Sequence, residues 1–129
     1  MKSVSAHIVD ARSIENRLLE LSSSRSFFAL YTSRGYPNSH KNYELVFGWG
    51  AAQQHDADDL STGGFERGWK FGYLGYELRH AFETLESGNP ALGDWPNAQF
   101  FTPQIAGTLS IDGTLTIYAQ SEVLAQEAL

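Results

Sequence analysis

The side chains able to carry out chemistry in this sequence are serines, histidines and carboxylates, because the chain of 129 residues contains no cysteine. A catalytic site needs a nucleophile beside a base, or paired acid–base groups, on rigid elements. The sequence has no Gly-x-Ser-x-Gly elbow, the motif that exposes a nucleophilic serine in many hydrolases. The four histidines, His7, His40, His55 and His80, show no His-x-x-x-His pairing. No complete catalytic set is therefore evident.

Two local clusters combine histidine with carboxylates, which are common metal ligands. Glu77, His80 and Glu83 follow one another at three-residue spacing, which places them on one helix face. This cluster lacks the second half of a dinuclear site. His55 precedes the run 56–59 (Asp-Ala-Asp-Asp), which lacks the spacing of a calcium loop. We interpret both clusters as solvated surface and predict no metal site and no cofactor in this chain.

Gly72 and Gly75 lie in an aromatic stretch, 69–76 (Trp-Lys-Phe-Gly-Tyr-Leu-Gly-Tyr). A phosphate-binding loop would need a third glycine or a Lys-Ser/Thr pair, and a helix that begins directly afterwards. Glycine within a strand instead indicates a bulge or a close approach of two backbones. We therefore predict that both glycines serve packing.

The elements that would position these residues follow from the hydrophobic pattern. Residues 26–33 and 43–49 are continuously apolar and aromatic-rich, which is typical of strands covered on both faces. Residues 3–9 alternate loosely and predict another strand. An apolar stripe of Ile14, Leu18, Leu19 and Leu21 predicts a helix, capped by Asp10 or Ser13 and ended by the serines at 22–24.

The second half of the chain reads as strands, turns and short helices. Asp112-Gly113 between two apolar runs, 104–110 and 115–119, predicts a hairpin with a type I′ turn. Short helices are expected at 77–86 and from Ser121 onward, and the polar stretch 53–68 is expected to be a mobile loop. These elements predict an α+β fold of mainly antiparallel strands, in one or two sheets, with two or three short helices on one side.

Composition limits the class of protein. The net charge is −6, and all nine Lys and Arg residues lie between Lys2 and Arg79. A nucleic-acid-binding protein needs a clustered basic stripe, so we expect no nucleic-acid partner. No apolar run approaches the roughly 20 residues that span a bilayer, and the first residues lack a secretory signal. We expect one domain, residues 1–129, without membrane contact and located in the cytoplasm.

The segment 68–78 (Gly-Trp-Lys-Phe-Gly-Tyr-Leu-Gly-Tyr-Glu-Leu), followed by 83–87 (Glu-Thr-Leu-Glu-Ser), resembles a family signature. It is similar to the N-terminal region of para-aminobenzoate (aminodeoxychorismate) synthase component I and its relative anthranilate synthase component I. That family carries Trp-x-Phe-Gly-x-x-x-Tyr-Asp-Leu, so Glu77 replaces the usual aspartate. The short 53–68 connection is closer to the para-aminobenzoate synthases. Further similar positions are Pro96, Phe100-Phe101, Pro103 and the strands at 28–33 and 42–47.

The resemblance implies a non-catalytic N-terminal domain in a folate-pathway transferase, or alternatively in anthranilate synthase, a lyase. In that family, chorismate and magnesium bind in a larger C-terminal domain, which this chain does not contain. A glutamine amidotransferase subunit supplies the ammonia that is added to chorismate. The positions of this segment that match the family signature would then be structural rather than catalytic. These structural positions are Trp69, Phe71, Gly72, Gly75, Tyr76 and Glu77.

In some members of the family the N-terminal domain also holds tryptophan. The resemblance places that pocket at Ser33 and Tyr43; the alternative is that Ser33 caps a strand and Tyr43 packs in the core. Two other interpretations of the chain remain open. It is a stand-alone binding module for an aromatic amino acid, or a small enzyme that uses Glu77, His80 and Glu83. As a detached domain, the chain is expected to self-associate through an open sheet edge or an apolar sheet face.

Overall fold

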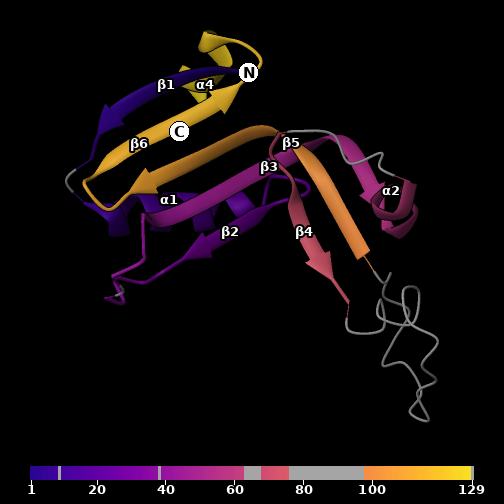
Figure 1. The fold of residues 1–129 in the computed structure, drawn as a ribbon. Coiled ribbons are helices and arrows are strands. Elements are labelled where there is room, and N and C mark those ends of the chain that lie inside the picture. The colour runs from indigo at the N-terminus through magenta and orange to yellow at the C-terminus, as the bar shows by residue number, and fades with distance from the viewer. Residues whose placement is uncertain (9, 38, 63–67, 76–97, 129) are drawn as a thin grey trace. The chain divides into compact units, whose positions relative to one another are not determined.

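The computed structural model describes residues 1–8, 10–37, 39–62, 68–75 and 98–128 (Figure 1). The chain divides into two compact units. The first comprises Met1–Ala51 and Pro103–Leu129, and the second comprises Ala52–Thr102. The third and fifth strands are long enough to contribute residues to both units.

The described residues form a mainly antiparallel sheet of six strands with three short helices, which confirms the expected α+β class. Hydrogen bonds join the strands in the order β1-β6-β5-β3-β2, and β4 pairs with β5. The pairs β1–β6, β5–β6, β2–β3 and β4–β5 are antiparallel. In chain order, the elements are β1 (Lys2–His7), α1 (Ala11–Ser22), β2 (Ala29–Thr32), β3 (Tyr43–Asp56), α2 (Ala57–Thr62), β4 (Phe71–Leu74), β5 (Ala98–Ser110), β6 (Thr114–Ala119) and α4 (Glu122–Glu127).

Helix α1 begins and ends where its polar residues predict. The Asp10 side chain accepts a hydrogen bond from the backbone N–H of Arg12 at 3.1 Å, satisfying one of the free donors of the first turn. At the other end, the hydroxyls of Ser22, Ser23 and Ser24 donate to carbonyls three residues earlier, at 2.6–3.1 Å. These bonds compete with the next turn of helix, so the helix ends there.

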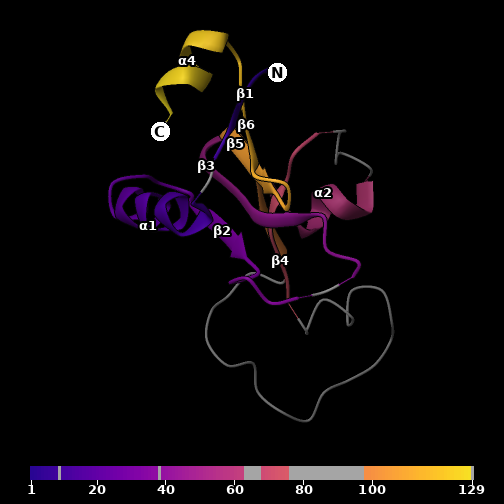
Figure 2. The same cartoon turned by 90° about the vertical axis from the view of Figure 1, so that its left-hand side faces the viewer.

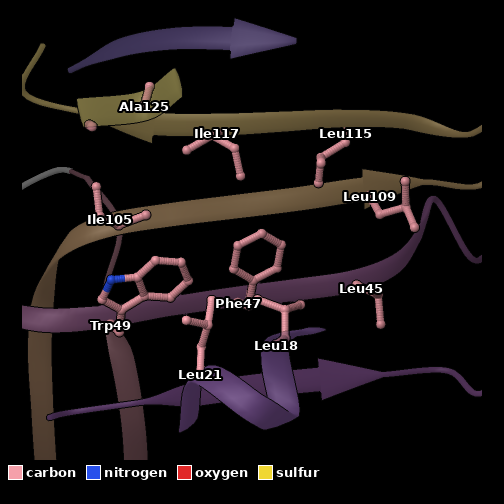
Figure 3. Close-up of a cluster of buried hydrophobic side chains, with 11 residues drawn as sticks. Leu18, Leu21, Leu45, Phe47, Trp49, Ile105, Leu109, Leu115, Ile117 and Ala125 are labelled. Carbon is pink, nitrogen blue, oxygen red and sulfur yellow. The ribbon is translucent and has the colours of Figure 1, made fainter. Parts of the chain in front are cut away.

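The core of the first unit lies between α1 and one face of the sheet. Leu18, fully buried, and Leu21 point from α1 toward Phe47 and its neighbours (Figure 3). Ala125 of α4 belongs to the same cluster, and Figure 2 shows α1 and α4 on the same side of these strands. Gly107 lies beneath the Phe47 ring, where an added Cβ would be 2.2 Å from the ring Cζ atom. The aromatic ring thus occupies the space that a larger residue would need.

Strands β2 and β3 differ in length from the prediction. Strand β2 begins at Ala29 rather than at residue 26, because Phe27 adopts φ = 50°, a left-handed conformation that a strand does not accommodate. Strand β3 continues to Asp56, and α2 follows directly, so the first part of 53–68 is ordered. Asp56 accepts from the N–H of Asp59 while Asp59 accepts from the N–H of Asp56. This reciprocal capping starts the helix.

The β5–β6 hairpin is present, but its turn is not the predicted type I′. That turn needs positive φ at two successive residues; in the described residues around this turn only Gly113 has it, at φ = 90°. The loop instead spans three residues, 111–113, and Gly113 N–H donates to the Ser110 carbonyl at 3.1 Å. A type I turn followed by a left-handed glycine is the usual three-residue solution. The Asp112 carboxylate accepts from the N–H of Thr114 and secures the loop.

Candidate functional site

A groove with a volume of about 700 Å³ lies in the first unit, within the size range of small-molecule sites. It is bounded by α1, by the turn that follows β2 and by the β5–β6 turn. Figure 1 shows that α1 begins at the end of β5 and β6 where the β5–β6 turn lies. The lining residues are Ile8, Ala11, Arg12, Glu15, Asn16, Leu19, Thr32, Arg34, Gly35, Glu44, Leu45, Leu109, Ser110, Ile111 and Gly113.

One face of α1 forms a wall of the groove. Arg12, Glu15 and Leu19 follow at spacings of three and four residues, so they lie one above another on the helix. Charged groups occupy the first turns of this wall and an apolar side chain the next. Across the groove, Leu45 and Leu109 are almost completely buried. The groove therefore combines a charged part with an apolar part.

Glu15 carries the least exposed charge on that wall. Only 16% of its side chain is exposed, and its carboxylate lies 3.9 Å from Nε of Arg34, whose side chain is 79% exposed. Within the described parts of the chain, no hydrogen bond to this carboxylate is formed. A largely buried carboxylate is strongly stabilised by a hydrogen-bond donor. A single solvent-exposed guanidinium at this distance stabilises it only slightly. Glu15 can therefore accept a hydrogen bond from a donor group of a ligand.

Arg34 is held on the rim of the groove by an unusual backbone conformation. Its φ is 49°, a left-handed value that costs a bulky residue about 1–2 kcal/mol. The turn offsets part of this cost, because the N–H of Arg34 donates to the Thr32 hydroxyl at 3.0 Å and that of Gly35 to the Ser33 hydroxyl at 3.3 Å. Backbone strain of this kind is concentrated at ligand-binding positions.

Glu44, at the far side of the groove, is already paired. The Ser33 hydroxyl donates to its carboxylate, and Lys41 Nζ lies 2.9 Å away. These two hydrogen bonds, with the positive charge of Lys41, hold the pKa of Glu44 below its usual value of 4.5. The negative charge of Glu44 is therefore compensated by Lys41. Lys41 is anchored further by donating to the Tyr36 carbonyl at 2.9 Å.

The two residues predicted for a tryptophan pocket lie beside the groove but do not line it. Ser33 follows β2 and its hydroxyl is engaged with Glu44. Tyr43 begins β3 with 49% of its surface exposed. The sequence prediction missed Arg12 and Glu15, although their spacing along the predicted helix was the one available signal.

The second unit holds the described part of the aromatic segment. In β4 the ring of Phe71 stacks on Trp69, with centroids 5.8 Å apart, and meets Phe101 of β5 at the same distance. At Gly72 an added Cβ would lie 2.0 Å from the Gln99 carbonyl oxygen, so the two backbones approach as only glycine permits. Gly75 follows β4. Tyr76, Glu77, His80 and Glu83, with the helix predicted at 77–86, lie outside the described residues.

His55, in the second unit, is buried, with 4% of its surface exposed. Its Nε2 lies 2.9 Å from the Thr102 hydroxyl, and its Nδ1 is 3.9 Å from Asp59. Asp56 and Asp59 are occupied in capping α2, so the run 56–59 has a structural role. In the part of the chain that the structure describes, no three histidine, aspartate or glutamate residues form a metal-binding group.

No family model, curated protein or solved structure matches this chain. No helix among the described segments is long and apolar enough to cross a membrane.

Proposed function

We propose that this chain is the non-catalytic N-terminal domain of a chorismate-aminating synthase of the para-aminobenzoate component I type. One observation carries the proposal. The two aromatic segments that bear the family resemblance pair with each other, Phe71 opposite Phe101 and Gly72 opposite Phe100. Segments more than 25 positions apart in sequence thus belong to one structural feature, in which glycine is required by the approach of the backbones.

In this proposal the chemistry belongs to the absent domain. A chorismate-binding domain of the same parent chain would hold chorismate and magnesium, and a glutamine amidotransferase subunit would supply ammonia. The present chain would contribute packing and a place for a regulatory ligand. In this proposal the present chain carries out no step of the reaction.

Two measurements test the proposal. The gene should continue past the codon for Leu129 into a chorismate-binding domain. The isolated chain, incubated with chorismate, ammonia and magnesium, should form no anilinic product by fluorescence or mass spectrometry. Measurable turnover that is lost in Glu77→Ala would contradict both the proposal and the structural role of Glu77. A stop codon directly after Leu129 would contradict the assignment as an N-terminal domain but would leave the structural role of Glu77 unaffected.

The groove supports a second candidate, a stand-alone module that binds a small molecule. Its volume of about 700 Å³ and its combination of buried leucines with charged side chains are typical of ligand sites. A module of this kind would bind its ligand saturably as an isolated chain, which calorimetry on the purified chain measures. Because the synthase domain could also hold a regulatory ligand, the two candidates are separated by the gene, which continues into a chorismate-binding domain only in the first.

A further inference from the structure

We propose that the groove binds a primary amine with a compact apolar body, and that the ammonium group pairs with Glu15. The inference rests on the groove acting as a binding site, as in the second candidate above, and is independent of the synthase assignment. The ligand must carry a positive charge, and Glu15 is the side chain that binds this charge.

The arrangement of charge by depth favours a cationic ligand. The Glu15 side chain is 16% exposed, whereas its partner Arg34 is 79% exposed, and Arg12 is exposed at the start of α1. The acidic group is thus the inner one and the basic groups are the outer ones. Electrostatic attraction is strongest where water is excluded, so an ammonium group at Glu15 gains more than a carboxylate at the solvated arginines.

Of the two carboxylates that line the groove, Glu15 has more capacity to accept hydrogen bonds from a ligand than Glu44. Glu44 already accepts from Ser33 and lies 2.9 Å from Lys41 Nζ, so an incoming cation would have to displace an anchored lysine. Among the described residues, the one cationic group within 4.0 Å of the Glu15 carboxylate is the guanidinium of Arg34, at 3.9 Å. An ammonium group brings three donors and can approach to hydrogen-bonding distance, where a charge-assisted bond is strong.

The apolar part of the groove accounts for the body of the ligand. Leu19 lies one helical turn after Glu15 and is 49% exposed, and Ile111 of the β5–β6 turn is 58% exposed. Leu45 and Leu109 close the inner side. A ring or a branched chain attached to the amine would cover Leu19 and Ile111, and the removal of this apolar surface from water stabilises the complex.

Four small molecules that share a phenyl ring on a two-carbon chain test the charge requirement. Calorimetry at pH 7 and low salt would compare 2-phenylethylamine with 2-phenylethanol, 3-phenylpropionate and L-phenylalanine. We expect the amine to bind at least tenfold more tightly than the alcohol, and the acid more weakly than the alcohol. L-Phenylalanine, which adds a carboxylate, should bind no more tightly than the amine. Amide shifts in NMR spectra should locate the amine at residues 11–19 and 109–113.

Three variants connect the affinity to Glu15. Glu15→Gln should weaken amine binding about tenfold and leave binding of the alcohol unchanged. Arg34→Gln should tighten amine binding severalfold, because it removes the competing cation; a purely structural role of Glu15 predicts no such gain. Glu20→Gln is the matched control on the same helix, since Glu20 is 71% exposed, pairs with Arg17 and does not line the groove. It should bind all four compounds as the wild type does.

Each result bears on a defined part of the inference. Equal affinities for amine and alcohol, tighter binding of the acid or of L-phenylalanine, or an unchanged Glu15→Gln variant with wild-type circular dichroism would overturn the amine assignment and leave the groove as a site. If no compound binds at millimolar concentration, the binding-module candidate fails as well. None of these outcomes affects the test of the synthase proposal.

Discussion

At position 72 there is no room for a side chain. Even a Cβ atom would lie 2.0 Å from the Gln99 carbonyl oxygen and 2.7 Å from Cα of Phe100. Gly72→Val must therefore push β4 away from β5 or break their pairing, and we expect it to lower the free energy of unfolding by about 1–3 kcal/mol. Urea denaturation followed by tryptophan fluorescence measures this effect.

Gln99→Val is the control for Gly72→Val. It introduces the same side chain at an exposed position of the same ladder, opposite Tyr73, where valine suits a strand. Its stability should stay within about 0.5 kcal/mol of the wild type. If both variants unfold at the wild-type midpoint, the close approach at Gly72 does not constrain the fold.

Glu44 makes part of the stability dependent on pH. Its pKa is lowered in the folded state by the Ser33 hydroxyl and by Lys41. A carboxyl whose folded pKa is depressed stabilises the protein above its unfolded pKa, and this stabilisation is lost as pH falls through the folded pKa. The stability difference between wild type and Glu44→Gln should therefore be larger at pH 7 than at pH 3.

Urea unfolding at the two pH values measures this difference. Glu20→Gln, which removes only a surface ion pair with Arg17, should differ little from the wild type at both. A Glu44→Gln effect that is the same at pH 3 and pH 7 would show that the carboxylate is not stabilised by its partners.

The chemistry of single residues was only partly predictable from the sequence. Residue types and motifs led us to expect no nucleophile–base pair. Glu15 could not be identified, because its importance depends on its burial in the folded chain and on Arg34, 19 positions later. Nothing local distinguishes Glu15 from Glu20, which lies on the same helix and is exposed to solvent.

At the scale of elements, α1 contributes to the core through one stripe. Leu18 is fully buried against the sheet, whereas its neighbour Leu19 is 49% exposed. Leu18→Ala should lower the free energy of unfolding by about 3–5 kcal/mol, because it removes buried contacts and leaves a cavity. Leu19→Ala, the matched change at the next position, should cost less than about 1 kcal/mol. Equal losses in urea denaturation would mean that α1 does not pack as described.

Elements with local signals were predicted well, and elements that depend on distant residues were not. Helix α1 has its own cap and its own terminating serines, and the β5–β6 hairpin has Asp112-Gly113. The first part of β5 was missed because Pro103, which removes a backbone donor, argues against a strand. Strand β3 was predicted to end at residue 49, because its polar continuation, 53–56, carries no apolar alternation.

At the scale of the whole molecule, the groove is assembled from α1, the turn after β2 and the β5–β6 turn, which lie up to about 100 positions apart. The expected fold class contains no information on this arrangement. It follows from the strand order, which brings the β5–β6 hairpin beside β1 and β3. No local pattern in the sequence indicates contacts between segments so far apart, so only the three-dimensional arrangement shows the groove.

The strand order also bears on the expected self-association. Among the described residues, strands β1 and β2 end the order, and strands at the edge of a sheet are the ones that pair with another chain. Strand β1 carries Lys2 and is polar, whereas β2 (Ala-Leu-Tyr-Thr) has no charge. Charged side chains discourage edge pairing, so β2 is the edge that we expect to pair with the same strand of a second copy about a two-fold axis.

Sedimentation velocity between 1 and 100 µM tests this pairing. We expect the mass of the wild type to rise toward that of a dimer with concentration. In Tyr31→Lys, β2 gains a positive charge, and the dimer should dissociate because charged side chains on an edge strand discourage pairing. Tyr36→Lys places the same charge on a loop residue that is 74% exposed and should associate as the wild type does. A chain that stays monomeric throughout, or a Tyr31→Lys variant that still dimerises, would rule out pairing through β2.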